Sequence, residues 1–325
     1  MIASLTEWVR RDWMCFWFGP PSPREQLALI RIGTALVLVF VLYVNTFDMT
    51  STFHTMTAGA NTPGPEGHPP FFPLEVFSWG HTVGWVWTVH TLAIIVSLML
   101  MLGIFPRLMA LLCMVFLFGY AKYNPSMVIG LDYLLLTALF YLVLSPSADV
   151  LSVYSLPPAV SELPVAGGRP RVWDTEPVGP QYSWGTFPLR LLQLHLSVMY
   201  FQSGLRRLGG DWLAGQAFWH PRIQELSPPV APETLDMFPS MLSFFTYTML
   251  LFELLYPVFI WNRRLRYPAF AVMVLVHLTV GVLWDVLPFA FLMMVLNVSF
   301  LPSEGLADLR EGLRLALARA LGRKI

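Results

Sequence analysis

Charged residues are scarce in this chain: they make up 12% of its 325 residues, whereas a soluble domain carries about a quarter. The twenty basic and twenty acidic side chains cancel to a formal net charge of zero, which argues against a nucleic-acid partner. Cysteine is nearly absent as well. Cys15 and Cys113 lie far apart in apolar stretches, so the sequence predicts neither a disulfide framework nor a cysteine-based metal site.

What the chain has in abundance is apolar sequence. Hydrophobic residues make up 56% of it, which predicts an all-α fold, a polytopic integral membrane helical bundle in the lipid bilayer. Eight apolar runs are candidates for transmembrane helices. The expected spans are residues 25–46, 84–103, 107–123, 129–145, 187–206, 239–261, 267–284 and 287–301.

The distribution of basic residues predicts the orientation, because lysine and arginine accumulate in cytoplasmic loops. With the amino terminus inside, fourteen of the twenty basic residues fall in inside segments, four outside and two within spans. Both termini are therefore expected in the cytoplasm. Segment 47–83 contains no lysine or arginine and is expected outside. Arg206 and Arg207 also fall outside, against the general rule, which makes them informative.

The domain organisation follows from the same pattern. Residues 1–24 form an aromatic interfacial segment, and residues 25–302 form one transmembrane domain without an internal repeat. Segment 146–186 is a cytoplasmic loop rich in proline and glycine. Residues 303–325 space leucines and arginines at helical intervals, which predicts an amphipathic helix on the membrane surface. In the sequence WDVLP, Asp285 and Pro288 predict a tight hairpin between the last two spans.

Ionisable groups within spans are the candidates for a functional site, because each costs about 2.5–3.5 kcal/mol to insert. The spans contain Arg31, His90, Asp132, Arg190, His195, Glu253 and His277. Arg31 and Arg190 lie near helix starts, where long side chains are expected to snorkel to the membrane surface. His90 and His277 are either core histidines bonded to a carbonyl or members of a site. Glu253 lies mid-span and requires a partner, an arginine or a histidine.

The fifth span carries the densest set of polar residues. His195, Met199, Gln202 and Arg206 share one helical face, which is expected to point into an outward-opening pocket. The sequence RRLGGDW follows directly, and two alternatives stay open for its arginines. They bind a carboxylate, a phosphate or a polarised quinone oxygen, or one of them forms a structural salt bridge with Asp211. No histidine or carboxylate spacing predicts a metal site.

The stretch VMYFQSGLRRLGGDWLAGQAFW, residues 198–219, resembles the signature helix of the vitamin K-dependent gamma-carboxylase-like family, the horizontally transferred transmembrane (HTTM) proteins. The resemblance covers most of residues 25–302. It implies a bacterial cytoplasmic-membrane protein with a quinone as candidate cofactor. In the family's carboxylases, a lysine after the signature is the base that deprotonates vitamin K hydroquinone, and Arg207 stands at its position.

This sequence departs from the carboxylase pattern at two places. Arginine stays protonated, with a pKa above about 12, so Arg207 cannot act as that base. Carboxylases also carry a histidine before a tyrosine in the fourth span, where this sequence has Asp132 before Tyr133. Glutamate carboxylation is therefore not expected.

Two functions stay open. One is a carboxylase- or epoxidase-like membrane enzyme with altered chemistry, whose pocket binds a quinone, lipid or peptide. The other is a non-catalytic membrane accessory protein for the maturation or export of a partner protein or peptide. The candidate catalytic residues are Arg207, His195, Glu253 and His277. The candidate substrate-binding residues are Arg206, Gln202, Asp132, Tyr133, Asp211 and Trp212.

Overall fold

The computed structural model describes residues 13–19, 23–47, 83–123, 130–155, 185–217 and 239–320, and within these ranges all regular structure is helical. A helix forms at each of the eight predicted positions. Their bounds are α2 (Arg24–Phe47), α4 (Val83–Leu102), α5 (Pro106–Tyr123), α6 (Gly130–Leu144), α7 (Thr186–Arg206), α11 (Pro239–Trp261), α12 (Arg266–Leu283) and α13 (Leu287–Asn297). The predicted all-α class is confirmed.

Four of these helices, α2, α4, α11 and α12, are long and apolar enough to cross a membrane by themselves. A fifth candidate pairs α13 and the short 3-10 helix Val298–Phe300 with the start of α14 (Ser303–Ala320), across a bend of 112°. The apolar helices thus support a membrane protein, while the count of eight spans stays a prediction.

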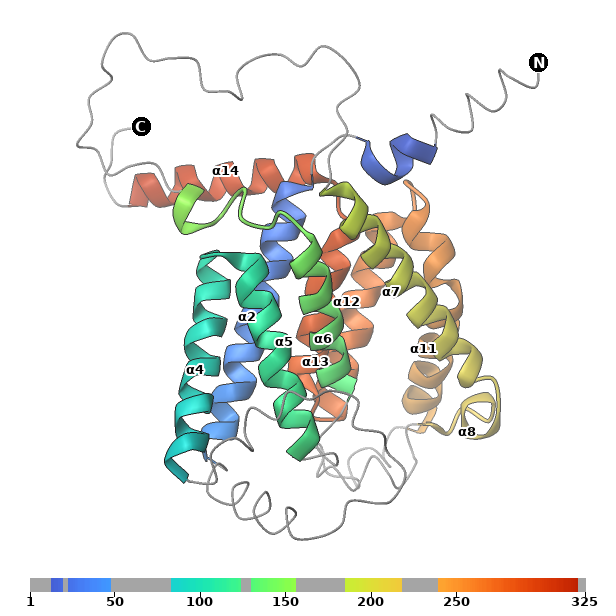
Figure 1. Cartoon of the computed structure of the whole chain (residues 1–325). Coiled ribbons are helices and arrows are strands. Elements are labelled where there is room, and N and C mark those ends of the chain that lie inside the picture. The colour runs from blue at the N-terminus through green and yellow to red at the C-terminus, as the bar shows by residue number, and fades with distance from the viewer. Residues whose placement is uncertain are drawn as a thin grey trace, which may run out of the picture.

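The long helices run side by side in alternating directions, and α14 lies across one end of the bundle (Figure 1). The short helix α8 (Gly210–Leu213) lies at the opposite end. We call these the α14 end and the α8 end. The α4–α5 and α11–α12 turns, both predicted to be cytoplasmic, lie at the α14 end (Figure 1). Arg310 of α14 pairs with Glu25 of α2 there, with 3.0 Å between Nη1 and Oε1. That this end faces the cytoplasm, and that α14 lies on the membrane surface, stay predictions.

The hairpin predicted between the last two spans is confirmed. α12 ends at Leu283 and α13 begins at Leu287, with Asp285 in the left-handed region at φ 54°. The Val286 amide donates to the Gly281 carbonyl at 2.9 Å. The hairpin brings His277 of α12 and Asn297 of α13 into the same core.

Arg31 corrects one prediction. Instead of snorkelling, its side chain is fully buried and donates to the backbone carbonyls of Ser147 and Leu151, just after α6. These carbonyls satisfy a charge that would otherwise be unpaired within the bundle, so Arg31 holds the segment after α6 against α2. Arg190 is partly buried, and its guanidinium lies over the Phe16 ring at 5.1 Å from the ring centroid.

A close contact between α7 and α11 positions the residues discussed below. A Cβ atom at Gly204 would lie 2.9 Å from Leu254 Cγ and 3.0 Å from the Leu254 backbone nitrogen. Only glycine allows the two helices to approach this closely, as small residues do in membrane helix pairs. The next residues along α7 therefore lie directly beside α11.

Gly204→Val is expected to separate α7 from α11, because the backbone of Leu254 cannot move aside as a flexible side chain would. The expected cost is about 1–3 kcal/mol of unfolding free energy, measured as a lower thermal midpoint in detergent. Gly312→Ala is the control, because no atom lies within 4 Å of its added Cβ. An equal loss in both variants would contradict the close contact.

Candidate functional site

The centre of the candidate site is an ion pair between Arg207 and Glu253. Arg207 directly follows α7, and its Nη1 donates to Glu253 Oε1 on α11. Glu253 is buried, with 6% of the residue exposed, so a cation beside it is required. The partner that the sequence demanded for Glu253 is therefore Arg207.

The other surroundings of the Arg207 guanidinium leave it partly available. Its Cζ lies 4.4 Å from the centroid of the Trp212 ring in α8, so the indole contacts it as a cation–π partner. Tyr247 of α11 donates to the Leu213 carbonyl at 3.1 Å and fixes α8 in place. A guanidinium has five N–H donors. Within the described part of the chain, the Arg207 side chain donates one hydrogen bond, to Glu253.

A chain of buried hydrogen bonds lies beside this ion pair. The Tyr256 hydroxyl donates to Asn297 Oδ1, and Asn297 Nδ2 donates to the Tyr200 hydroxyl at 3.0 Å. The Tyr200 hydroxyl lies 3.4 Å from His277 Nε2. These four residues, which we call the polar chain, connect α7, α11, α12 and α13. Tyr256 follows Glu253 by three positions, so the chain begins one helical turn from the ion pair.

The polar chain has a defined direction. His277 Nδ1 lies 2.9 Å from the Met273 carbonyl, which can only accept, so Nδ1 carries the proton and Nε2 is left as an acceptor. The Tyr200 hydroxyl then donates to His277 Nε2 and accepts from Asn297. His277 is therefore a core histidine bonded to a carbonyl, one of its two predicted alternatives, and it also belongs to the polar chain.

The predicted polar face of the fifth span is wrong in its direction. His195, Gln202 and Arg206 are exposed, whereas the buried face of α7 includes Tyr200 and Gly204. His195 Nδ1 lies 3.1 Å from the Tyr141 hydroxyl on α6. The physical reason is the contact at Gly204, which turns the small and aromatic residues of α7 toward α11. Of the two arginines, only Arg207 therefore reaches Glu253.

The remaining predicted residues lie at the ends of helices. Asp132 is in the first turn of α6, where a carboxylate is favourable, and Tyr133 next to it is 65% exposed. Asp211 is in the first turn of α8 and has interactions of its own. The ion pair found for Arg207 is with Glu253, on another helix, rather than the predicted alternative that closes the turn.

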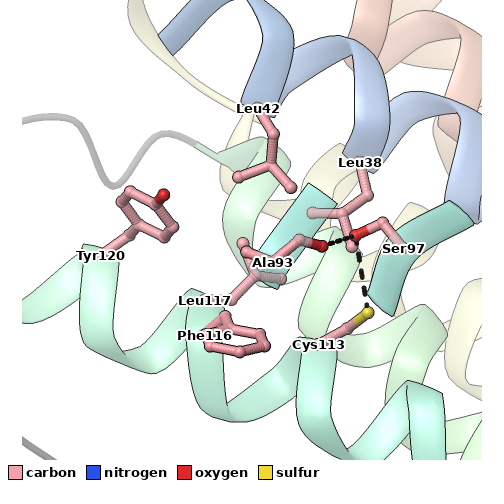
Figure 2. A pocket seen from close by; sticks show the side chains of 8 residues that line it. All are labelled: Leu38, Leu42, Ala93, Ser97, Cys113, Phe116, Leu117 and Tyr120. Carbon is pink, nitrogen blue, oxygen red and sulfur yellow. Dashed lines mark hydrogen bonds between the residues drawn. The ribbon is translucent and has the colours of Figure 1, made fainter. Parts of the chain in front are cut away.

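Outside this centre, a small hollow lies between α2, α4 and α5, too narrow to admit a water molecule (Figure 2). Within it, Ser97 donates to the Ala93 carbonyl and lies 3.7 Å from the Cys113 sulfur. Next to it, His90 bonds to the hydroxyls of Thr46 and Tyr120 rather than to a carbonyl. The lining residues are Leu38, Leu42, Ala93, Ser97, Cys113, Phe116, Leu117 and Tyr120.

The fold and site together define a helical membrane-type bundle with an ion pair and a polar chain buried in its second half. Residues 180–304 match the model of the HTTM domain, the family that the resemblance predicted. The matched segment contains Arg207, Glu253 and the whole polar chain. No curated protein and no solved structure matches the chain. In the described part of the chain, no three histidine, cysteine or acidic side chains are placed to hold a metal ion.

Sequence reasoning missed Tyr200 and Tyr256, because tyrosines within apolar spans count as hydrophobic residues. Asn297 is a neutral polar residue within the last predicted span, and its residue type alone identifies no partner. A usable signal was present: two tyrosines and an asparagine in spans that also contain a buried glutamate and histidine require hydrogen-bond partners. These side chains can satisfy that requirement by forming hydrogen bonds with one another.

Proposed function

We propose that this chain is an integral membrane protein whose HTTM domain binds an oxygen-bearing ligand at Arg207 and Glu253, entering from the α8 end. The candidate ligands are a quinone, a lipid head group and a peptide. The observation that carries the proposal is a buried carboxylate paired with a guanidinium that, among the described residues, donates to that carboxylate alone.

A purely structural ion pair is a poor explanation for this arrangement. Replacing a buried ion pair with apolar side chains is often neutral or stabilising, so its retention in an apolar bundle suggests a use beyond stability. Intramembrane charges usually mark a ligand or ion pathway. Here Trp212 contacts the guanidinium, and Glu253 fixes its position.

The chemistry that this site supports is recognition and charge stabilisation. Arg207 holds a permanent positive charge and can donate two parallel hydrogen bonds to a ligand oxygen or oxyanion. It cannot remove a proton from a ligand, so base catalysis of the carboxylase type is not proposed for it. Any proton transfer would involve Glu253 or the hydroxyl groups of the polar chain.

The test is native mass spectrometry of the full chain purified in mild detergent. The double variant Arg207→Met/Glu253→Gln removes both charges and leaves no buried ion unpaired, and it is expected to lose a small molecule that the unaltered protein retains. The control is Arg310→Met/Glu25→Gln, which removes the ion pair at the α14 end and is expected to retain it. Equal retention in both would refute the proposal. A co-purified protein with no small molecule would favour the accessory function instead.

A further inference from the structure

We propose that the Arg207–Glu253 pair is an oxyanion site in which binding of a carboxylate or phosphate group is coupled to the uptake of one proton by Glu253. This rests on the proposed function and narrows its ligand class. The oxyanion belongs either to a free small molecule or to an anionic lipid head group, which share this chemistry.

The Arg207 guanidinium has donors that an anionic ligand can use. Its Nη1 donates to Glu253, and Trp212 contacts it as a cation–π partner, so none of the described residues accepts a hydrogen bond from its other N–H groups. The Arg207 side chain is 21% exposed, so the free donors can be reached from the α8 end. A planar fork of parallel N–H groups matches the two oxygens of a carboxylate or phosphate.

Binding of an oxyanion would change the charge balance around Arg207. An oxyanion on Arg207 would place two negative groups beside one guanidinium. The titratable groups on α11 and on the elements packed against it at this end are Arg206, Arg207, Tyr200, Tyr247, Tyr256, His277, Asp211 and Asp285. Arg206 is exposed on another face of α7, so among the described residues Arg207 is the permanent cation paired with Glu253. A buried carboxylate that has lost its share of a cation becomes neutral by binding a proton.

The atom that would bind this proton is Glu253 Oε2. Glu253 Oε2 is buried, and no donor among the described residues reaches it with hydrogen-bond geometry, although Ser203 on α7 also faces the carboxylate. A proton taken from water onto Oε2 satisfies this oxygen. The resulting O–H then serves as a donor to the bound oxyanion. Both partners of the ion pair would then hold the ligand.

The test is titration calorimetry on the full chain with sulfate and with hexanoate, each in two buffers of different ionisation enthalpy. We expect uptake of about one proton per bound anion, and an affinity that falls about tenfold for each unit of pH increase. Glu253→Gln is expected to bind without proton uptake and without this pH dependence. Arg207→Met/Glu253→Gln is expected not to bind, and Arg310→Met/Glu25→Gln to bind as the unaltered chain does.

A lipid source is tested in bilayer discs of phosphatidylcholine with and without phosphatidylglycerol. Retention of phosphatidylglycerol that depends on Arg207, seen by native mass spectrometry, identifies a lipid head group, whereas binding of the soluble anions alone identifies a free ligand. Arg207-dependent binding without proton uptake overturns the coupling but leaves the proposed function standing. Failure to bind either anion or the lipid overturns the oxyanion site, and a retained neutral molecule would still support the proposed function.

Discussion

Arg207→Ala is expected to lower the free energy of unfolding by about 3–5 kcal/mol, because it leaves the Glu253 carboxylate buried without its cation. Glu253→Gln is expected to cost less, because Arg207 is more exposed and keeps an acceptor in the glutamine side chain. The double variant Arg207→Met/Glu253→Gln is expected to be more stable than Arg207→Ala alone. Thermal unfolding in detergent, followed by fluorescence, gives the three values.

The Arg310–Glu25 pair at the α14 end is the matched control. Its arginine side chain is 38% exposed, so Arg310→Ala is expected to have a smaller effect than Arg207→Ala. A double-mutant cycle of Arg207→Met, Glu253→Gln and their combination separates the pair from its surroundings: additive losses from the two single variants would show that the two residues do not interact. Such additivity would contradict the ion pair as the centre of the site.

Asn297→Leu is expected to have the second large effect, because it removes the residue that joins the two tyrosines of the polar chain. The substitution keeps the volume but leaves the Tyr256 hydroxyl without its acceptor and the Tyr200 hydroxyl without its donor. Each orphaned buried group costs about 1–3 kcal/mol. Tyr256→Phe orphans only the Asn297 oxygen, so it is expected to cost less. The thermal midpoints of the two variants provide the comparison.

The decisive result is which of the two variants, Asn297→Leu or Tyr256→Phe, has the lower thermal midpoint. If Asn297→Leu is as stable as the unaltered chain, the four residues do not form a connected chain of hydrogen bonds. Tyr200→Phe is a further check, because it removes the hydroxyl partner of His277 Nε2 and is expected to shift the resonance of that nitrogen while the Nδ1 contact with Met273 persists. Nuclear magnetic resonance of labelled histidine detects this change.

The sequence predicted the helices well, because the length and position of each apolar run are local properties. The hairpin at Asp285 and Pro288 was also predictable. A polar turn residue followed by a proline is typical of a turn that leads into the first turn of a helix. That Glu253 needs a partner, an arginine or a histidine, followed from the cost of a lone charge in an apolar bundle. The sequence did not show which residue is this partner.

The rest depended on packing that the sequence does not encode locally. A helical wheel places His195 and Gln202 on one stripe of α7 and Tyr200 and Gly204 on a neighbouring stripe, and polarity favoured the first. The fit of Gly204 against Leu254 decided for the second. Arg31 was missed for the same kind of reason, because the carbonyls that receive it lie more than a hundred residues away in the chain.

The most direct test of the account is an experimental structure of the full chain in a lipid bilayer disc, at a resolution that shows bound small molecules. We expect density for a ligand oxygen against the Arg207 guanidinium, next to Glu253 and reached from the α8 end. A resolved Arg207–Glu253 pair with no adjacent density, together with a ligand bound elsewhere in the bundle, would contradict it.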